Sequence, residues 1–171
     1  MRPLRHALLG LLLAACNTSE PAVDLQLAQT LEIRNARSPE PGLLCAGQLT
    51  EPQIEALLDS GYRSFVTLRA PEEKGAEADA ALLGQEGAHF TRLTIRGAED
   101  INEQNARRLD TLLADLERPL VLYCGSSNRV GALYGARAFY VQGASPAEAL
   151  EAGRRAGVTR LEGRLRELTG G

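Results

Sequence analysis

Residues 120–129 read Leu-Val-Leu-Tyr-Cys-Gly-Ser-Ser-Asn-Arg, and this stretch is the most informative part of the chain. Its first four residues are apolar and predict a buried strand, whereas the loop after Cys124 is small and polar. A helical pattern follows at once, from Val130 to Val141. This order points the loop N–H groups and the helix N-terminus at one spot, where they favour a bound oxyanion and a cysteine thiolate.

Cys124 and Arg129 bracket this loop and are the candidate catalytic pair. A thiolate at Cys124 is a nucleophile, and the guanidinium of Arg129 can bind two oxygens of a phosphate or sulfate group at once. The candidate substrate-binding residues fill the loop between them: Gly125, Ser126, Ser127 and Asn128. The alternative is that Cys124 is a small buried apolar residue and that Arg129 is an ordinary surface residue.

Strand and helix patterns alternate along the rest of the chain. A capping box at Thr50–Gln53 starts one helix, which Gly61 ends. The other expected helices are 76–85, 102–117, 130–141, 146–156 and 159–168. The expected strands are 30–33, 42–45, 62–68, 89–95 and 119–123. Such alternation predicts a single α/β domain, with a mostly parallel sheet flanked by helices and ligands at the carboxyl ends of its strands.

The N-terminus has the pattern of an export signal. Arg2 and Arg5 precede the apolar run Ala7–Ala15, which is too short for an ordinary membrane span. The run ends in Leu13-Ala14-Ala15-Cys16, which resembles the lipobox of bacterial lipoproteins and implies lipid attachment to Cys16. The alternative is an ordinary secretory signal with a cysteine near its cleavage site. We expect a signal at residues 1–15, the lipidated cysteine and a polar tether at 16–30, and one domain at 31–171. The protein would be exported, anchored to a bacterial membrane and facing the periplasm.

Composition narrows the classes of partner. The chain of 171 residues carries a net charge of −3 and has no Trp, which argues against a nucleic-acid partner. It contains 2 His and 3 Cys and shows no zinc-type spacing, so no metal site is expected. Cys45 and Cys124 remain as thiols in an exported protein. A reversible disulfide between them is one hypothesis, and a buried free Cys45 is the other.

Two further segments resemble a known family when taken together with the cysteine loop. They are the stretch from Pro41 to Ile54 and the stretch from Gly61 to Arg69. The chain resembles the bacterial tyrosine/dual-specificity phosphatase-like proteins, and most closely the phosphatase-like domain of β-lactamase-hydrolase-like proteins. The resemblance implies the cysteine-phosphatase α/β fold, a phosphorylated substrate and hydrolysis of a phosphate monoester without a cofactor. Cys124 would be the nucleophile, forming a cysteinyl-phosphate, and Arg129 the phosphate ligand.

The loop departs from that family's pattern in three respects. Four residues separate Cys124 from Arg129 where five are usual, Ser127 replaces a glycine, and Val130 replaces a hydroxyl-bearing residue. A rhodanese-like sulfurtransferase, which shares the short loop, is therefore one alternative. A catalytically weak module that binds an anion or a partner is the other.

The resemblance also implies a general acid from the loop before the helix at 102–117. Asp100 is the first candidate for this acid and Glu99 the second. The alternative for Asp100 is a local one, because Asp100 and Glu103 have the spacing of a capping box.

Overall fold

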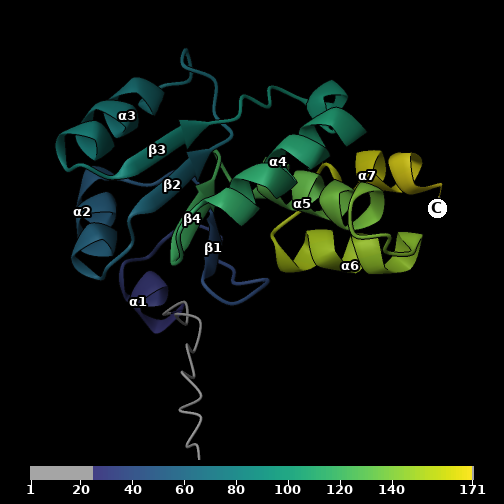
Figure 1. Ribbon diagram of the computed structural model, residues 1–171, viewed down its shortest axis with the longest axis horizontal. Coiled ribbons are helices and arrows are strands. Elements are labelled where there is room, and N and C mark those ends of the chain that lie inside the picture. Colours follow the sequence, from purple (N-terminus) through teal and green to yellow (C-terminus); the bar gives the residue numbers. More distant parts are fainter. Residues whose placement is uncertain (1–24, 171) are drawn as a thin grey trace, which may run out of the picture.

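Four parallel strands form the centre of the molecule in the computed structural model, which describes residues 25–170 (Figure 1). They are β1 (Leu43–Ala46), β2 (Ser64–Thr67), β3 (His89–Arg92) and β4 (Leu120–Tyr123). Their order across the sheet is β1-β4-β2-β3, so the last strand lies between the first two. Because all four strands run the same way, the loops that follow them meet at one edge of the sheet.

Helices cover both faces of this sheet, as Figure 1 shows. One face carries α1 (Leu25–Thr30), α2 (Glu51–Asp59) and α3 (Ala76–Gln85). The other carries α4 (Glu103–Asp115), α5 (Asn128–Tyr140), α6 (Pro146–Arg155) and α7 (Glu162–Thr169), and the short 3-10 helix η1 (Ala98–Asp100) precedes α4. Both faces are buried around β1 and β4, which explains why these two strands read as continuous apolar runs, whereas β3 at the sheet edge is partly exposed and contains polar residues. The predicted single α/β domain with a parallel sheet between helices is confirmed.

The predictions for the N-terminal part need correction. The expected strand at 30–33 is absent, because Leu25–Thr30 is helical and Glu32 has a φ of 52°. A β-strand does not accommodate such a positive φ. The expected tether at 16–30 is likewise too long, since Ala28 in α1 is fully buried against the core. The signal at 1–15 and the lipidated Cys16 lie outside the described residues. Among residues 25–170, no helix is both long and apolar enough to cross a bilayer.

Two glycines in α5 allow a close helix contact. The sequence, with Gly131 and Gly135 on one face of this helix, suggests an approach to the sheet, but both glycines face α6 instead. A Cβ added at Gly131 would lie 2.0 Å from Val158 N and 2.6 Å from Gly153 O. The backbone of α6 and of the turn after it therefore packs directly on the first turn of α5, which follows the cysteine loop.

Gly131→Ala should destabilise the fold, because the new methyl group meets rigid backbone rather than a flexible side chain. We expect a loss of about 1–3 kcal/mol in the free energy of unfolding, measured with urea. Gly84→Ala is the control, because a Cβ at Gly84 in α3 meets nothing within 4 Å. There the change should stabilise the helix by about 0.5–1 kcal/mol. Equal stability of the two variants would contradict the close contact.

Candidate active site

The loop from Cys124 to Arg129 is held open by neighbouring segments. The carbonyl oxygen of Ser126 accepts a bond from Asn35 Nδ2 at 3.0 Å, and that of Gly125 accepts one from Gln48 N at 3.4 Å. With these carbonyls turned outward, the N–H groups at positions 125, 126, 128 and 129 donate to no acceptor within residues 25–170. Free N–H groups at the start of a helix form an anion cradle.

Cys124 lies beneath this cradle, just past the end of β4. Its N–H donates to Ala46 O at 3.2 Å, which continues the pairing with β1. The residue is 1% exposed, belongs to the core of the α4–α7 face and is not among the residues that line the cavity over the loop. The side chain of Val130, the residue after the arginine, is fully buried in the core of the α4–α7 face. The position therefore places no hydroxyl beside the sulfur.

Arg129 is held in place by a carboxylate that the sequence did not reveal. Its NH1 and NH2 donate to the two oxygens of Glu73 at 2.6 and 2.7 Å, and NH1 also donates to Ile95 O at 2.7 Å. A guanidinium has five N–H donors, so Nε–H and one NH2–H remain beyond these bonds, and Arg129 also makes a side-chain hydrogen bond with Cys124. These two donors lie side by side and form a second fork that can take two oxygens of a phosphate group.

Glu73 is ionised by this contact. The bidentate bond from Arg129 is the main cause that lowers the pKa of Glu73 to about 2, against its ordinary 4.5. The same bond raises the pKa of Arg129. Behind Glu73 lies the buried Arg69, whose Nε is 3.7 Å from Glu73 Oε2 and whose NH1 donates to Asp79 Oδ2 at 3.0 Å. Alternating charges therefore run from α3 to the loop.

A cavity of about 740 Å³ opens over the loop. Segments that follow β2, β3 and β4 contribute to its wall, as do the turn after α1 and the connection between α6 and α7. The lining residues are Arg34, Ala70, Glu72, Glu73, Arg96, Gly97, Gly125, Ser126, Asn128, Arg129, Arg160 and Leu161. Carboxyl-end loops thus meet at the cavity, as expected for an open parallel sheet.

The four predicted loop residues have different surroundings. Gly125 and Ser126 line the cavity. Asn128 also lines it, but its Oδ1 accepts bonds from Thr159 N, Thr159 Oγ1 and Leu161 N at 2.9–3.1 Å. Ser127 is fully buried and donates through Oγ to Ala156 O at 3.0 Å, so its side chain points away from the cavity. Ser127 and Asn128 therefore fasten the loop to the C-terminal helices.

Asp100, the first candidate acid, does not line the cavity. Its Oδ2 accepts the N–H of Arg96 at 2.6 Å within the turn that contains η1. It does not cap α4 either, because Asn102 takes that place and accepts the N–H of Asn105 at 3.0 Å. Glu99 lies nearer the cavity, since a Cβ added at Gly97 in the wall would be 3.1 Å from Glu99 Oε2. The acid role of Asp100 stays a prediction.

Cys45 and Cys124 are both free thiols buried on the same side of the sheet. The register pairs Cys45 with Leu122, so Cys124 is its diagonal neighbour on the adjacent strand. Diagonal positions in a sheet are about 7–8 Å apart, which exceeds the span of an ordinary disulfide. Burial raises the pKa of Cys45, so its thiolate is disfavoured. This geometry disfavours the disulfide hypothesis and favours a buried free Cys45.

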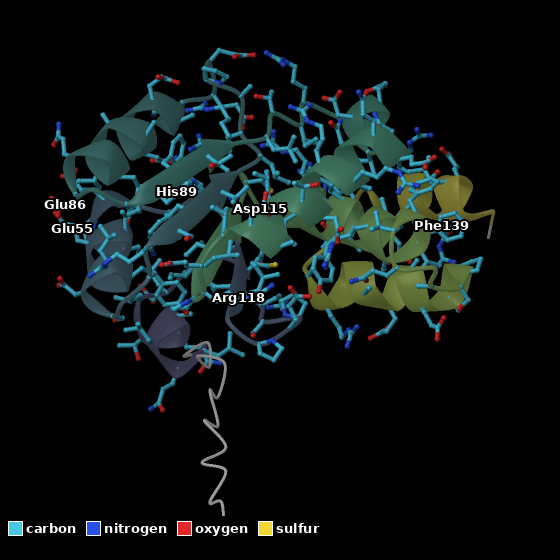
Figure 2. All side chains as sticks on the ribbon, in the orientation of Figure 1. Glu55, Glu86, His89, Asp115, Arg118 and Phe139 are labelled. Atoms are coloured by element: carbon cyan, nitrogen blue, oxygen red, sulfur yellow. The ribbon has the colours of Figure 1, made fainter. Side chains whose placement is uncertain are left out.

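His89, the histidine outside the expected signal, lies away from this site. His89 (labelled in Figure 2) is the first residue of β3, whereas the cavity lies at the carboxyl ends of the strands. Asp115, also labelled there, ends α4, and Arg118 lies in the connection from α4 to β4. Within residues 25–170, no three His, Cys, Asp or Glu side chains are grouped so that they could hold a metal ion.

Solved structures share this fold. A candidate phosphatase from Neisseria meningitidis aligns with a TM-score of 0.62 and 22% identity, over 77% of this chain and 96% of its own. A candidate phosphatase from Shewanella putrefaciens aligns with a TM-score of 0.61 and 18% identity, over 86% and 97%. TpbA of P. aeruginosa, solved in complex with pTyr, aligns with a TM-score of 0.52 and 18% identity, over 92% and 99%. The chain matches no protein-family model and no curated protein. At these identities the likeness shows that the fold is that of the phosphatase-like proteins.

The Glu73–Arg129 pair should make stability depend on acid pH. A carboxylate with a lowered pKa stabilises the fold fully above its ordinary 4.5, and this contribution is lost as the pH falls toward about 2. We therefore expect Glu73→Gln to abolish part of the stability loss that the wild type shows between these pH values, measured by urea unfolding. Glu55→Gln, at an exposed position of α2 labelled in Figure 2, is the matched control. An unchanged pH dependence in Glu73→Gln would refute the pairing.

Proposed function

We propose that this chain is a cysteine-dependent phosphate monoester hydrolase of the tyrosine/dual-specificity phosphatase-like type. The observation that carries the proposal is the arrangement over Cys124: unengaged loop N–H groups and a second donor fork on Arg129 face one cavity. The fold shared with candidate phosphatases, and with a protein solved in complex with pTyr, supports the same function.

The proposed reaction has two displacements at phosphorus. The Cys124 thiolate attacks phosphorus, the bond to the alcohol oxygen breaks, and a cysteinyl-phosphate and an alkoxide that takes up a proton result. Water then attacks phosphorus, the S–P bond breaks, and inorganic phosphate and the thiolate are formed. The loop N–H groups and the free fork of Arg129 stabilise charge on the equatorial oxygens in both steps. Glu73 is a positioning residue, because it acts only through Arg129.

The second step, in which the S–P bond breaks and the Cys124 thiolate leaves, should be the slower one. A hydroxyl next to the arginine would stabilise the departing thiolate, but Val130 is buried in the core and offers none. The loop N–H groups, the helix N-terminus and the neighbouring Arg129 remain to stabilise the thiolate. We infer that the cysteinyl-phosphate accumulates during turnover.

The catalytic pair can be tested with p-nitrophenyl phosphate and the full chain in detergent. Cys124→Ser should abolish hydrolysis, and Arg129→Lys should lower kcat/KM by at least about 100-fold because an ammonium cannot form the fork. Cys45→Ala, which removes the neighbouring buried thiol, is the matched control and should keep its activity. A burst of p-nitrophenol equal to the enzyme concentration is expected before the steady state.

The same assay set identifies the competing functions. Sulfur transfer from thiosulfate to cyanide without phosphatase activity would replace this proposal with a sulfurtransferase. Phosphate binding without either activity would indicate a binding module.

The role of Asp100 is tested with two leaving groups. If Asp100 protonates the leaving group, the loss of rate in Asp100→Asn should be larger with phenyl phosphate than with p-nitrophenyl phosphate. Equal losses would assign Asp100 to the turn that it bonds.

We further propose that the domain is exported and tethered by lipid at Cys16, facing the periplasm. The support is the sequence alone: a basic start, a short apolar run and Leu13-Ala14-Ala15-Cys16. In this setting the active site would act on phosphate esters outside the cytoplasm.

A lipid anchor at Cys16 should direct the protein into the detergent phase when detergent and aqueous phases are separated. The full chain expressed in a bacterium should incorporate labelled palmitate and separate into the detergent phase, whereas Cys16→Ala should do neither. Cys45→Ala should behave like the wild type. Labelling that survives Cys16→Ala would refute the lipid site, and a soluble, exported, unlabelled protein would indicate an ordinary secretory signal.

A further inference from the structure

Two arginines in the cavity wall have no carboxylate partner. Arg96 is paired with Glu72 at 2.9 Å, and Arg129 is paired with Glu73. Arg34 and Arg160 also line the cavity, but neither forms an ion pair within residues 25–170. The cavity therefore holds two uncompensated positive charges, although the chain as a whole carries a charge of −3.

Arg160 is placed by the active-site loop itself. It lies between Thr159 and Leu161, whose N–H groups both donate to Asn128 Oδ1, at 2.9 and 3.1 Å. The hydroxyl of Thr159 adds a third bond to the same oxygen at 3.0 Å. The backbone on both sides of Arg160 is thus fastened to the residue before Arg129, and its side chain joins the wall of the cavity.

Arg34, which comes from the N-terminal part of the chain, is also positioned by bonds to the active-site loop. Its neighbour Asn35 donates to Ser126 O at 3.0 Å, and its own NH1 is 3.5 Å from Gly125 O. Its carbonyl accepts the N–H of Gly47 at 2.7 Å. A Cβ at Gly47 would lie 3.1 Å from the Cβ and Cγ of Arg34, so the side-chain stem packs closely on that glycine. Two segments 126 residues apart thus each bond the loop and each deliver an unpaired arginine.

The cavity lacks an aromatic wall. Its lining contains no Phe or Tyr, and Leu161 and Ala70 are its aliphatic residues. Phe139, labelled in Figure 2, lies on α5 beside Tyr140 and away from the cavity. An aromatic phosphate ester would find no stacking partner here, whereas a further anionic group would meet Arg34 or Arg160.

We propose that the substrate is a small, non-aromatic polyol or sugar that carries at least two phosphate groups. One phosphate binds over Cys124 and is hydrolysed to inorganic phosphate and an alcohol, and a second binds Arg160 and Arg34. This inference rests on the proposed phosphatase function and names its substrate class.

The test compares glucose 1,6-bisphosphate with glucose 6-phosphate, which differ by one phosphate group. With the full chain in detergent, kcat/KM for the bisphosphate should exceed that for the monophosphate by about tenfold or more, because charge-assisted hydrogen bonds are strong. This ratio should fall at least about fivefold in Arg160→Gln, and further in Arg34→Gln/Arg160→Gln. Arg155→Gln, an exposed arginine of α6 outside this cavity, is the matched control and should keep the wild-type ratio.

Failure of the inference and failure of the function give different results. Hydrolysis of p-nitrophenyl phosphate that Cys124→Ser abolishes, with a bisphosphate-to-monophosphate ratio near one or a ratio unchanged in the double variant, overturns the inference alone. If no phosphate ester is hydrolysed, the function fails, and calorimetric binding of the two sugars decides the second site. Tighter binding of the bisphosphate that depends on Arg160 supports it, and equal binding overturns it.

A lipid headgroup could present the same pair of phosphates as a free sugar. Vesicles of phosphatidylcholine containing phosphatidylglycerophosphate, assayed beside soluble glucose 1,6-bisphosphate, separate the two sources. Faster release of phosphate from the vesicles, lost in the Arg34→Gln/Arg160→Gln variant, supports the inference with a lipid substrate. Faster release from the soluble sugar supports it with a free one.

Discussion

The bidentate contact between Glu73 and Arg129 is the constraint on which the site depends. Arg129 follows a loop of small residues, and without a partner its long side chain would sample many rotamers. Glu73 fixes one of its two donor forks and leaves the other facing the cavity. Arg69 and Asp79 extend the contact into the interior, so the end of β2, helix α3 and the start of α5 are joined by charge. Desolvation offsets part of the attraction in a half-buried ion pair, so its main value here is the orientation of Arg129.

The short loop is supported by the C-terminal helices. Ser127 adopts a φ of 62°, which costs free energy for any residue with a Cβ and would favour glycine at this position. The cost is offset because Ser127 Oγ donates to Ala156 O at 3.0 Å. The neighbouring Gly157 leaves room for it, since a Cβ there would lie 2.7 Å from Ser127 Oγ. The serine at this position therefore ties the loop to α6 rather than binding substrate.

The sequence was sufficient for the fold and for the strand, loop and helix around Cys124, and insufficient for the contacts that support them. Residues 120–129 predicted a strand, a loop and a helix, because these patterns are local. Glu73 could not be found this way, since it lies 56 residues before Arg129 in a charged loop that resembles any solvated turn. The acid role of Asp100 was inferred from loop order and stays a prediction, because the structure shows only that Asp100 accepts the N–H of Arg96. Neither long-range contacts nor side-chain direction is encoded in spacing.

The segments that brace the loop are the segments that carry Arg34 and Arg160. The side chain of Asn35, the neighbour of Arg34 in the sequence, donates to the loop carbonyl of Ser126. The side chain of Asn128, within the loop, accepts bonds from the residues on both sides of Arg160. An anion bound between these arginines would therefore be coupled to the same hydrogen bonds that hold the loop carbonyls outward. Since the outward carbonyls are what leave the loop N–H groups facing the cavity, a second phosphate bound by these arginines would reinforce the cradle for the first. The physical basis of selectivity in this site is then the same network that forms its catalytic loop.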